Sequence, residues 1–236
     1  MIIEPALYLF PVGLSNTEMT AVLPQANIDL LKQVRHFVVE NLRSARRFLK
    51  SVDKSINIDD LTFTELSEHT PPEAIPPMLE PLRRGEAVGV ISEAGCPAVA
   101  DPGADLVAAA QRAGIKVVPL VGPSSILLAL MASGFNGQRF AFEGYLPIDE
   151  GARTKRLKEM QQRINRERQT QIFIETPYRN NRLLAELASK LPGNMLLCVA
   201  SDITGDRESI ITRPLSEWAK AKYDYNKLPT IFLLFS

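Results

Sequence analysis

Short apolar runs alternate with amphipathic stretches along the first half of the chain. The runs are rich in valine, isoleucine and phenylalanine, as buried strands are, and they lie at Leu7–Val12, His36–Glu40, Thr62–Leu66, Ala87–Ser92 and Lys116–Leu120. Helix-like stretches separate them at Pro24–Gln33, Leu42–Ser51, Pro76–Arg84 and Ala104–Ala113. This alternation predicts an α/β fold in which a mostly parallel sheet is covered by helices on both faces.

The second half has a different pattern. Further strands are predicted at Arg139–Tyr145, Thr170–Glu175, Met195–Ser201, Glu208–Thr212 and Thr230–Phe235. Helices are predicted at Ser124–Ala132, Asp149–Arg168, Arg179–Leu191 and Pro214–Lys222. The last two strands form a hairpin-like group, which indicates a mixed, more antiparallel sheet. We therefore expect two αβα domains, over residues 1–119 and 120–236.

Composition narrows the class of protein. The 236 residues carry a formal net charge of zero, so nothing global indicates nucleic-acid binding. No apolar run is long enough to span a bilayer, and no basic segment precedes an apolar one at the N-terminus, so neither a membrane span nor a secretory signal is expected. The two cysteines and two histidines never cluster, which predicts no metal site and reduced thiols in the cytoplasm.

Loops punctuated by glycine and proline follow two of the predicted strands. The run Ala87–Ser92 leads into Gly95–Pro97 and Asp101–Gly103, and the next strand leads into Gly122–Ser125. Each loop alone is compatible with an ordinary turn, with Ser124 as a helix N-cap. Together they predict a ligand site, because parallel strands end at one edge of a sheet and small residues let the backbone approach a ligand. The glycine motifs of nicotinamide-dinucleotide and P-loop proteins are absent.

Basic residues gather in two helix-like stretches. The first holds Arg43, Arg46, Arg47, Lys50 and Lys54 against the single acid Asp53. The second lies within Asp149–Arg168 and is also net positive. Such runs are usually solvated helix faces. Two of them in a neutral chain make an anionic substrate such as RNA an open alternative.

The order of the motifs resembles the tetrapyrrole methylase superfamily of S-adenosylmethionine (SAM)-dependent methyltransferases. The resemblance is closest to its RsmI-type branch, which methylates a cytidine 2′-hydroxyl in small-subunit ribosomal RNA. The matching segments are Pro11–Leu14, Ser92–Pro97, Ala100–Gly103, Val117–Ser124, Arg139–Pro147 and Ile172–Arg179. The chain departs from the branch at Glu40–Arg43, where E-D-T-R is usual, and at Ser201–Gly205, where R-E-L-T-K is usual.

The resemblance implies a homodimeric methyltransferase with SAM in a cleft between the two domains. Carried over by motif, the cofactor-binding residues would be Pro11, Gly95, Cys96, Val99, Ser124, Ser125, Thr176, Ala200 and Thr230. The methyl group of SAM is already activated, so the protein must align the acceptor and remove its proton. Among the acidic residues at predicted strand ends, which include Glu93, Glu175 and Asp202, we predict Glu40 as the base and Arg43 as a phosphate-binding residue.

Three functions stay open on these grounds. The first is methylation of RNA, and the second is methylation of a small molecule such as a tetrapyrrole precursor. The third is a SAM-binding or RNA-binding protein without catalysis, which the changed segments at Asn41–Leu42 and Ser201–Gly205 motivate.

Overall fold

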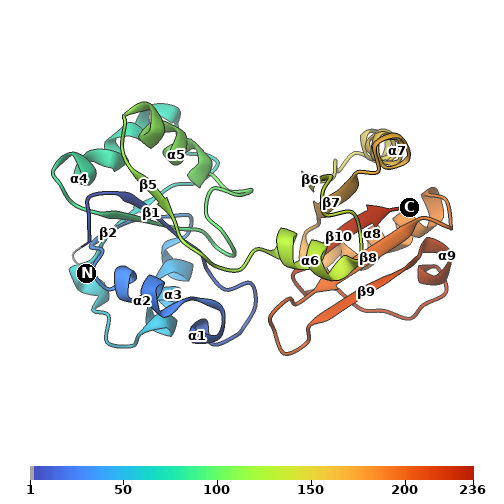
Figure 1. Ribbon diagram of the computed structural model, residues 1–236, viewed down its shortest axis with the longest axis horizontal. Coiled ribbons are helices and arrows are strands. Elements are labelled where there is room, and N and C mark those ends of the chain that lie inside the picture. Colours follow the sequence, from blue (N-terminus) through green and yellow to red (C-terminus); the bar gives the residue numbers. More distant parts are fainter. Residues whose placement is uncertain (1–2) are drawn as a thin grey trace. The chain divides into compact units, whose positions relative to one another are not determined.

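The computed structural model describes residues 3–236, which fold into two compact units divided between Ser124 and Ser125. Each unit has its own five-stranded sheet (Figure 1). In the described part of the chain, no helix is long and apolar enough to cross a membrane. The ligand cleft expected between the domains stays a prediction.

The sheet of the first unit is parallel throughout, as predicted. Its strands are β1 (Leu7–Phe10), β2 (His36–Val39), β3 (Thr62–Glu65), β4 (Val88–Ile91) and β5 (Val117–Pro119). They are ordered β3-β2-β4-β1-β5, so β1 and β4 lie side by side at the centre. All residues of these two strands are buried, which explains their continuous apolar sequence.

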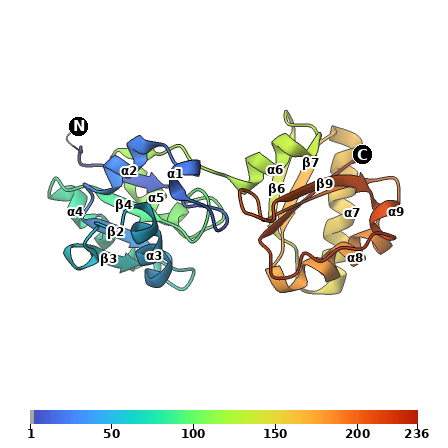
Figure 2. The same ribbon diagram turned by 90° about the horizontal axis from the view of Figure 1, so that it is seen from below.

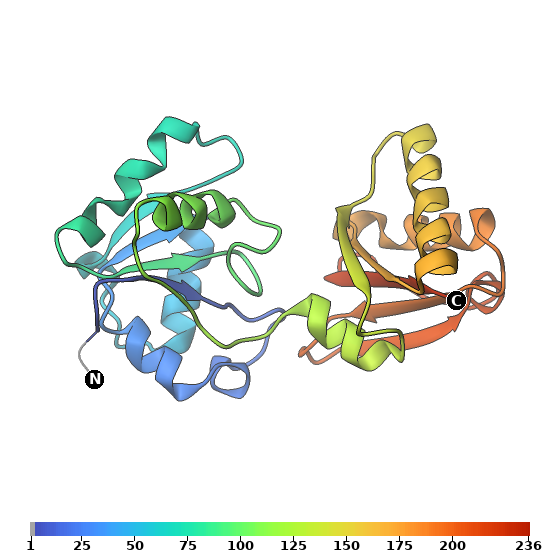
Figure 3. The ribbon, with the colours of Figure 1, turned by 45° about the horizontal axis from the view of Figure 1, so that its top comes forward.

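Helices cover both faces of this sheet (Figure 3). One face packs against α1 (Met19–Val22), α2 (Gln25–Leu31) and α3 (Leu42–Val52), and the other against α4 (Glu80–Arg83) and α5 (Gly103–Arg112). Short 3₁₀ turns lie at Ile58–Asp60, Pro72–Ala74 and Pro76–Leu79. The single helix predicted over Pro76–Arg84 is therefore wrong. Pro77 and Pro81 lack the N–H that a continuous helix needs, so a 3₁₀ turn precedes the short α4.

The sheet of the second unit is mixed, as predicted. Its strands are β6 (Phe140–Tyr145), β7 (Thr170–Ile174), β8 (Leu196–Ser201), β9 (Ser209–Pro214) and β10 (Thr230–Phe235), in the order β6-β7-β10-β8-β9. Only β6 and β7 pair in parallel. The predicted hairpin of the last two strands is wrong, because β8 lies between them. The strand β10 is buried along its whole length and takes the centre, whereas the half-exposed β9 forms an edge.

Helices also cover both faces of the second sheet. The helices α7 (Glu150–Glu167) and α8 (Asn180–Lys190) pack on one face, and α6 (Ser125–Ser133) lies on the other (Figure 3). A 3₁₀ turn, Pro177–Arg179, precedes α8. The helix predicted over Pro214–Lys222 shrinks to α9 (Leu215–Trp218). Buried Trp218 anchors its end by donating a hydrogen bond from Nε1 to the Leu197 carbonyl (2.9 Å), and turns follow.

Candidate active site

Two loops at the carboxyl edge of the first sheet are joined by backbone hydrogen bonds. The Val12 N–H donates to the Gly95 carbonyl (2.9 Å), and the Gly95 N–H donates back to Val12 (3.1 Å). Gly95 has φ +71° and faces the Leu14 side chain, so a larger residue there would be strained. The loop after β1 and the loop after β4 therefore form one continuous wall.

The loop after β5 is held against the same wall. Gly122 approaches Pro11 so closely that a Cβ atom at position 122 would overlap the proline ring. The Cys96 thiol donates to the Pro123 carbonyl (3.5 Å), and Asn27 Nδ2 donates to the Val121 carbonyl (2.7 Å). Burial raises the pKa of the Cys96 thiol, which suits a packing role better than a nucleophilic one.

Asp101 shapes the loop after β4. Both of its carboxylate oxygens accept from the Ala98 N–H (3.0 and 2.9 Å), and Oδ1 also accepts from Gly103 (2.7 Å). This clamp holds Ala98 and Ala100 at φ 65° and 62°, a region that alanine rarely occupies. The D-P-G motif was visible in the sequence, but the role of Asp101 was not, because glycine and not alanine usually signals a left-handed backbone.

Glu40 follows β2 at the same edge of the sheet. Its Oε2 accepts a hydrogen bond from the Glu93 N–H (3.3 Å), and no ion pair with a cation is found within residues 3–236. Partial burial raises the pKa of Glu40, and the nearby charges of Asp101, Glu93 and Glu68 raise it further. A carboxylate with a raised pKa is a suitable general base.

The other acidic candidates have stronger partners. Glu175 Oε1 accepts from Arg179 Nε (3.0 Å) and Nη2 (2.6 Å), and Asp202 Oδ2 accepts from the Arg207 N–H (2.9 Å). Glu93 Oε1 accepts from Ser44 Oγ (2.8 Å). The oxygens of these carboxylates are already engaged as hydrogen-bond acceptors, which leaves them less available to a substrate proton. Glu40 is therefore the best-suited base of the four.

The changed segment after Glu40 starts α3. Asn41 caps the helix, with Oδ1 accepting from the Ser44 N–H (3.1 Å). Arg43 in the first turn is exposed, and it forms no hydrogen bond or ion pair with any other described residue. Its guanidinium is therefore available to an anion.

In the second unit, three predicted cofactor residues lie at one edge of the sheet, namely where the neighbouring strands β7, β8 and β10 begin or end. Thr230 begins β10 and pairs with Ser201, and Ala200 pairs with the residue after Thr230. Because β10 runs antiparallel to β7, Thr176 just beyond β7 lies at this edge too. Thr230 Oγ1 lies 3.0 Å from Ser201 Oγ, and Thr176 Oγ1 accepts from Arg179 Nε (3.1 Å). Ala200 is fully buried between β10 and β9.

The remaining predicted cofactor residues are less enclosed. Ser124 directly precedes α6 and Ser125 begins it, and both are half-buried. Val99 is 49% exposed, which is unusual for an apolar side chain in a clamped loop. The structure therefore brings together Pro11, Gly95, Cys96 and the Gly122–Ser124 loop in the first unit.

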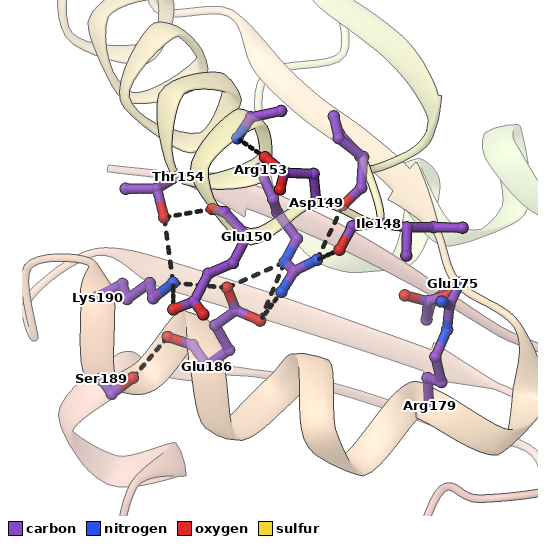
Figure 4. Close-up of polar contacts among 12 residues, drawn as sticks. Ile148, Asp149, Glu150, Arg153, Thr154, Glu175, Arg179, Glu186, Ser189 and Lys190 are labelled. Carbon is purple, nitrogen blue, oxygen red and sulfur yellow. Dashed lines mark hydrogen bonds and ion pairs between the residues drawn. The ribbon is translucent and has the colours of Figure 1, made fainter.

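Several arginines of α7 are engaged by acids, and Figure 4 shows the contacts of Arg153. Arg153 donates from Nε to both carboxylate oxygens of Glu186 (2.9 and 3.0 Å), and Lys190 binds the same carboxylate (2.9 Å). Arg156 and Arg163 both pair with the buried carboxylate of Glu143 on β6. Three cations of the second basic cluster are thus paired with acids distant in the chain, whereas Lys155, Lys158 and Arg166 form no ion pair within residues 3–236. Within residues 3–236, no group of histidine, cysteine and acidic side chains could hold a metal ion.

Comparisons with known proteins agree with this architecture. The sequence profile of the tetrapyrrole (corrin/porphyrin) methylases matches residues 7–219. The ribosomal RNA small subunit methyltransferase I of Vibrio cholerae is 33% identical, over 90% of this chain and 70% of that protein. Its counterpart from Escherichia coli O157:H7 is 30% identical, over 91% and 72%.

A solved structure has the same fold. The uroporphyrin-III C-methyltransferase of Thermus thermophilus, in complex with S-adenosylhomocysteine, matches with a TM-score of 0.58 and 18% identity, over 98% of this chain and 97% of that one. The chain belongs to the tetrapyrrole methylase family. It is a SAM-dependent methyltransferase, as the resemblance of its motifs implied.

Proposed function

We propose that this enzyme methylates RNA of the small ribosomal subunit at a ribose 2′-hydroxyl. The observation that carries the proposal is the similarity to small-subunit rRNA methyltransferases, which extends over nine-tenths of the chain. The exposed, unpaired Arg43 beside Glu40 supports an acceptor that carries phosphate. No described observation favours a tetrapyrrole acceptor over RNA.

We further propose the residues that contact SAM. They are Pro11, Gly95, Cys96, Val99 and Ser124 in the first unit, and Ser125, Thr176, Ala200 and Thr230 in the second. The support is chemical. Small residues and close loops expose backbone N–H and carbonyl groups to the polar parts of the cofactor, and an exposed Val99 offers apolar contact.

Glu40 and Arg43 are the proposed catalytic residues. When bound, SAM supplies a methyl group on a positively charged sulfur. Glu40 accepts the proton of the ribose hydroxyl, because an unassisted hydroxyl is a poor nucleophile near neutral pH. Arg43 binds a neighbouring phosphate and so fixes the direction from which the hydroxyl approaches.

We propose that the enzyme acts in the cytoplasm as a homodimer. Ribosomal RNA is found in the cytoplasm, so an rRNA substrate supports this location. Apolar side chains exposed on the second unit support a protein contact, namely those of Leu127, Met131, Phe140 and Tyr145. Light scattering on the purified protein tests the dimer, and a monomer at micromolar concentration would contradict it.

The direct test uses small ribosomal subunits from cells that lack this protein. They are incubated with SAM and purified enzyme, and the RNA is digested to nucleosides for mass spectrometry. We expect one 2′-O-methylnucleoside to increase with the wild type and not with Glu40→Gln. Methylation of a base instead of a ribose, or of no RNA at all by an enzyme that binds SAM, would overturn the proposal.

A further inference from the structure

The helix α3 carries an exposed strip of cations. Arg43 lies three and four residues before the adjacent Arg46 and Arg47, and Lys50 lies four and three residues after them, so the four cations share one side of α3. Ala45, Phe48 and Leu49 are buried in the core on the opposite side. A strip over these two turns is about 10 Å long.

Few acids neutralise this strip. Arg46 lies 5.7 Å from the centroid of the Phe63 ring, and Lys50 Nζ donates to the Lys54 carbonyl. Neither forms an ion pair with a carboxylate among residues 3–236. Asp53, the only acid in the sequence cluster, pairs with Lys32 (2.5 Å). The contrast is with Arg153, Arg156 and Arg163 of α7, which pair with Glu143, Glu159 and Glu186. Charge on α3 is therefore free to bind an external anion, whereas these three arginines of α7 are already engaged by acids.

An open groove runs beside the strip. The segment after β1, from Val12 to Met19, forms one wall, and Ser44, Arg47 and Ser51 of α3 form the other. Both walls lie on the same face of the first sheet, where Figure 2 shows α1 and α3. Phe48 contributes apolar surface, and Glu93 is the acidic residue that lines the groove.

The groove offers polar groups suited to a sugar-phosphate backbone. Arg47 has no hydrogen-bond or ion-pair partner among residues 3–236. The Ser15 hydroxyl is buried in the groove wall without a hydrogen-bond partner in the described chain, although buried hydroxyls are nearly always bonded. Glu93 Oε1 accepts a hydrogen bond from Ser44 Oγ of α3 (2.8 Å).

We infer that this groove and the cationic strip of α3 bind a single-stranded segment of the RNA substrate. The inference rests on the proposed function and adds where the RNA lies on the first unit. Arg47 and Lys50 contact phosphates, and the hydroxyls and amide of the opposite wall face riboses. Val12 and Gly13 line the groove, and Val12 also belongs to the wall of loops already described, so a strand bound in the groove contacts that wall.

The test measures binding of a fluorescein-labelled, unstructured 20-nucleotide RNA by anisotropy over a series of salt concentrations. The test variant is Arg47→Gln/Lys50→Gln. The matched control is Arg84→Gln/Arg112→Gln, which removes the same charge from exposed positions on the opposite face of the sheet. We expect the Kd of the test variant to be about 10- to 30-fold higher at 0.1 M salt. The negative slope of the log of the binding constant against log salt should become less steep by about 1.4, since each of the two lost phosphate contacts on a single strand contributes about 0.7. The control should match the wild type.

Three outcomes would overturn the inference. They are an unchanged Kd and slope in the test variant, equal losses in both variants, or a wild type that binds no RNA at low salt. If the wild type binds no RNA, the cationic strip of α3 suits an acidic protein instead.

The variant Arg47→Lys/Lys50→Arg should bind RNA as the wild type does, because the charge is kept. SAM binding is measured separately by calorimetry. A wild type that binds RNA through α3 but does not methylate small subunits would contradict the proposed function and not this inference.

Discussion

Gly122 and Pro11 lie so close together that the chain has no space for a side chain at position 122. One residue follows β5 and the other follows β1, so this contact holds two of the three loops of the proposed cofactor site together. The loop after β4 joins them through Val12 and Gly95. The position of each loop thus depends on the other two.

Gly122→Ala should therefore disturb the cofactor site. The added methyl group displaces Pro11, and overpacking of this kind costs about 1–3 kcal/mol. We expect the affinity for SAM to fall at least about tenfold. Calorimetry and thermal unfolding measure the two effects. Gly137→Ala is the control, because nothing lies within 4 Å of a Cβ at that position. Equal behaviour of the two variants would contradict the role of the contact.

Asp101→Ala should loosen the loop after β4. The substitution removes the acceptor for the Ala98 and Gly103 N–H groups, and losing such an acceptor costs about 1–3 kcal/mol. SAM affinity should fall as well, because Ala98 and Ala100 lose the clamp on their left-handed backbone. Asp105→Ala, at an exposed position in α5, should change stability by less than about 0.5 kcal/mol. Unchanged SAM binding by Asp101→Ala would count against the clamp.

Glu40→Gln should abolish most of the methyl transfer and leave SAM binding intact. Loss of a general base costs about 10²- to 10⁴-fold in rate. In the wild type the rate should rise with pH as Glu40 loses its proton, with a midpoint above the ordinary glutamate pKa because burial raises the pKa of Glu40. The control is Glu73→Gln, at an exposed position.

Stability separates a catalytic role of Glu40 from a structural one. A carboxyl group with a raised pKa binds its proton more tightly in the folded state, so the wild type loses stability as pH rises through that pKa. Glu40→Gln should therefore be at least as stable as the wild type at pH 8. A variant that is less stable there and inactive would point to a structural role.

Arg153→Met should destabilise the second unit. Arg153 and Glu186 are only 11% and 13% exposed, and the change leaves an almost buried carboxylate without its main partner. We expect a loss of about 2–4 kcal/mol, slightly below the value for a fully buried pair. Arg166→Met, at an exposed position of the same helix, is the control. Denaturant unfolding at neutral pH measures both.

The same ion pair predicts a pH dependence. Burial raises the pKa of Glu186, but hydrogen bonds from Arg153 and Lys190 outweigh it and lower the pKa overall. The stabilisation is therefore present above the unfolded-state pKa and is lost as pH falls through the folded-state value. The stability difference between the wild type and Arg153→Met should shrink in acid. A constant difference from pH 7 to pH 3 would contradict the assignment.

Much of the fold could be predicted from the sequence because hydrophobic periodicity reports burial. The central strands β1 and β4 of the first unit are continuous apolar runs, and the long helix over Asp149–Arg168 closely matches α7. Strand neighbours were harder to predict. Nothing local shows that β10 inserts between β7 and β8, since this depends on which strand buries more apolar surface in the assembled sheet.

For the candidate site too, some features could be predicted from the sequence and others could not. Glycine and proline identified the loops, because these residues restrict the backbone locally. The clamp by Asp101 and the Ser44–Glu93 contact join residues whose pairing no local pattern reveals. The two basic clusters looked equivalent as sequence. Acids on β6 and α8 pair with three arginines of α7, however, while no acid within residues 3–236 pairs with the cationic strip of α3.

The central claim is that this enzyme transfers the methyl group of SAM to RNA of the small ribosomal subunit. The most direct measurement incubates the enzyme and methyl-tritiated SAM with small subunits from cells lacking this protein, and then counts label in purified RNA. We predict about one methyl group per subunit with the wild type and a strongly reduced rate with Glu40→Gln. Label absent from the RNA, while calorimetry shows that the enzyme binds SAM, would contradict the account.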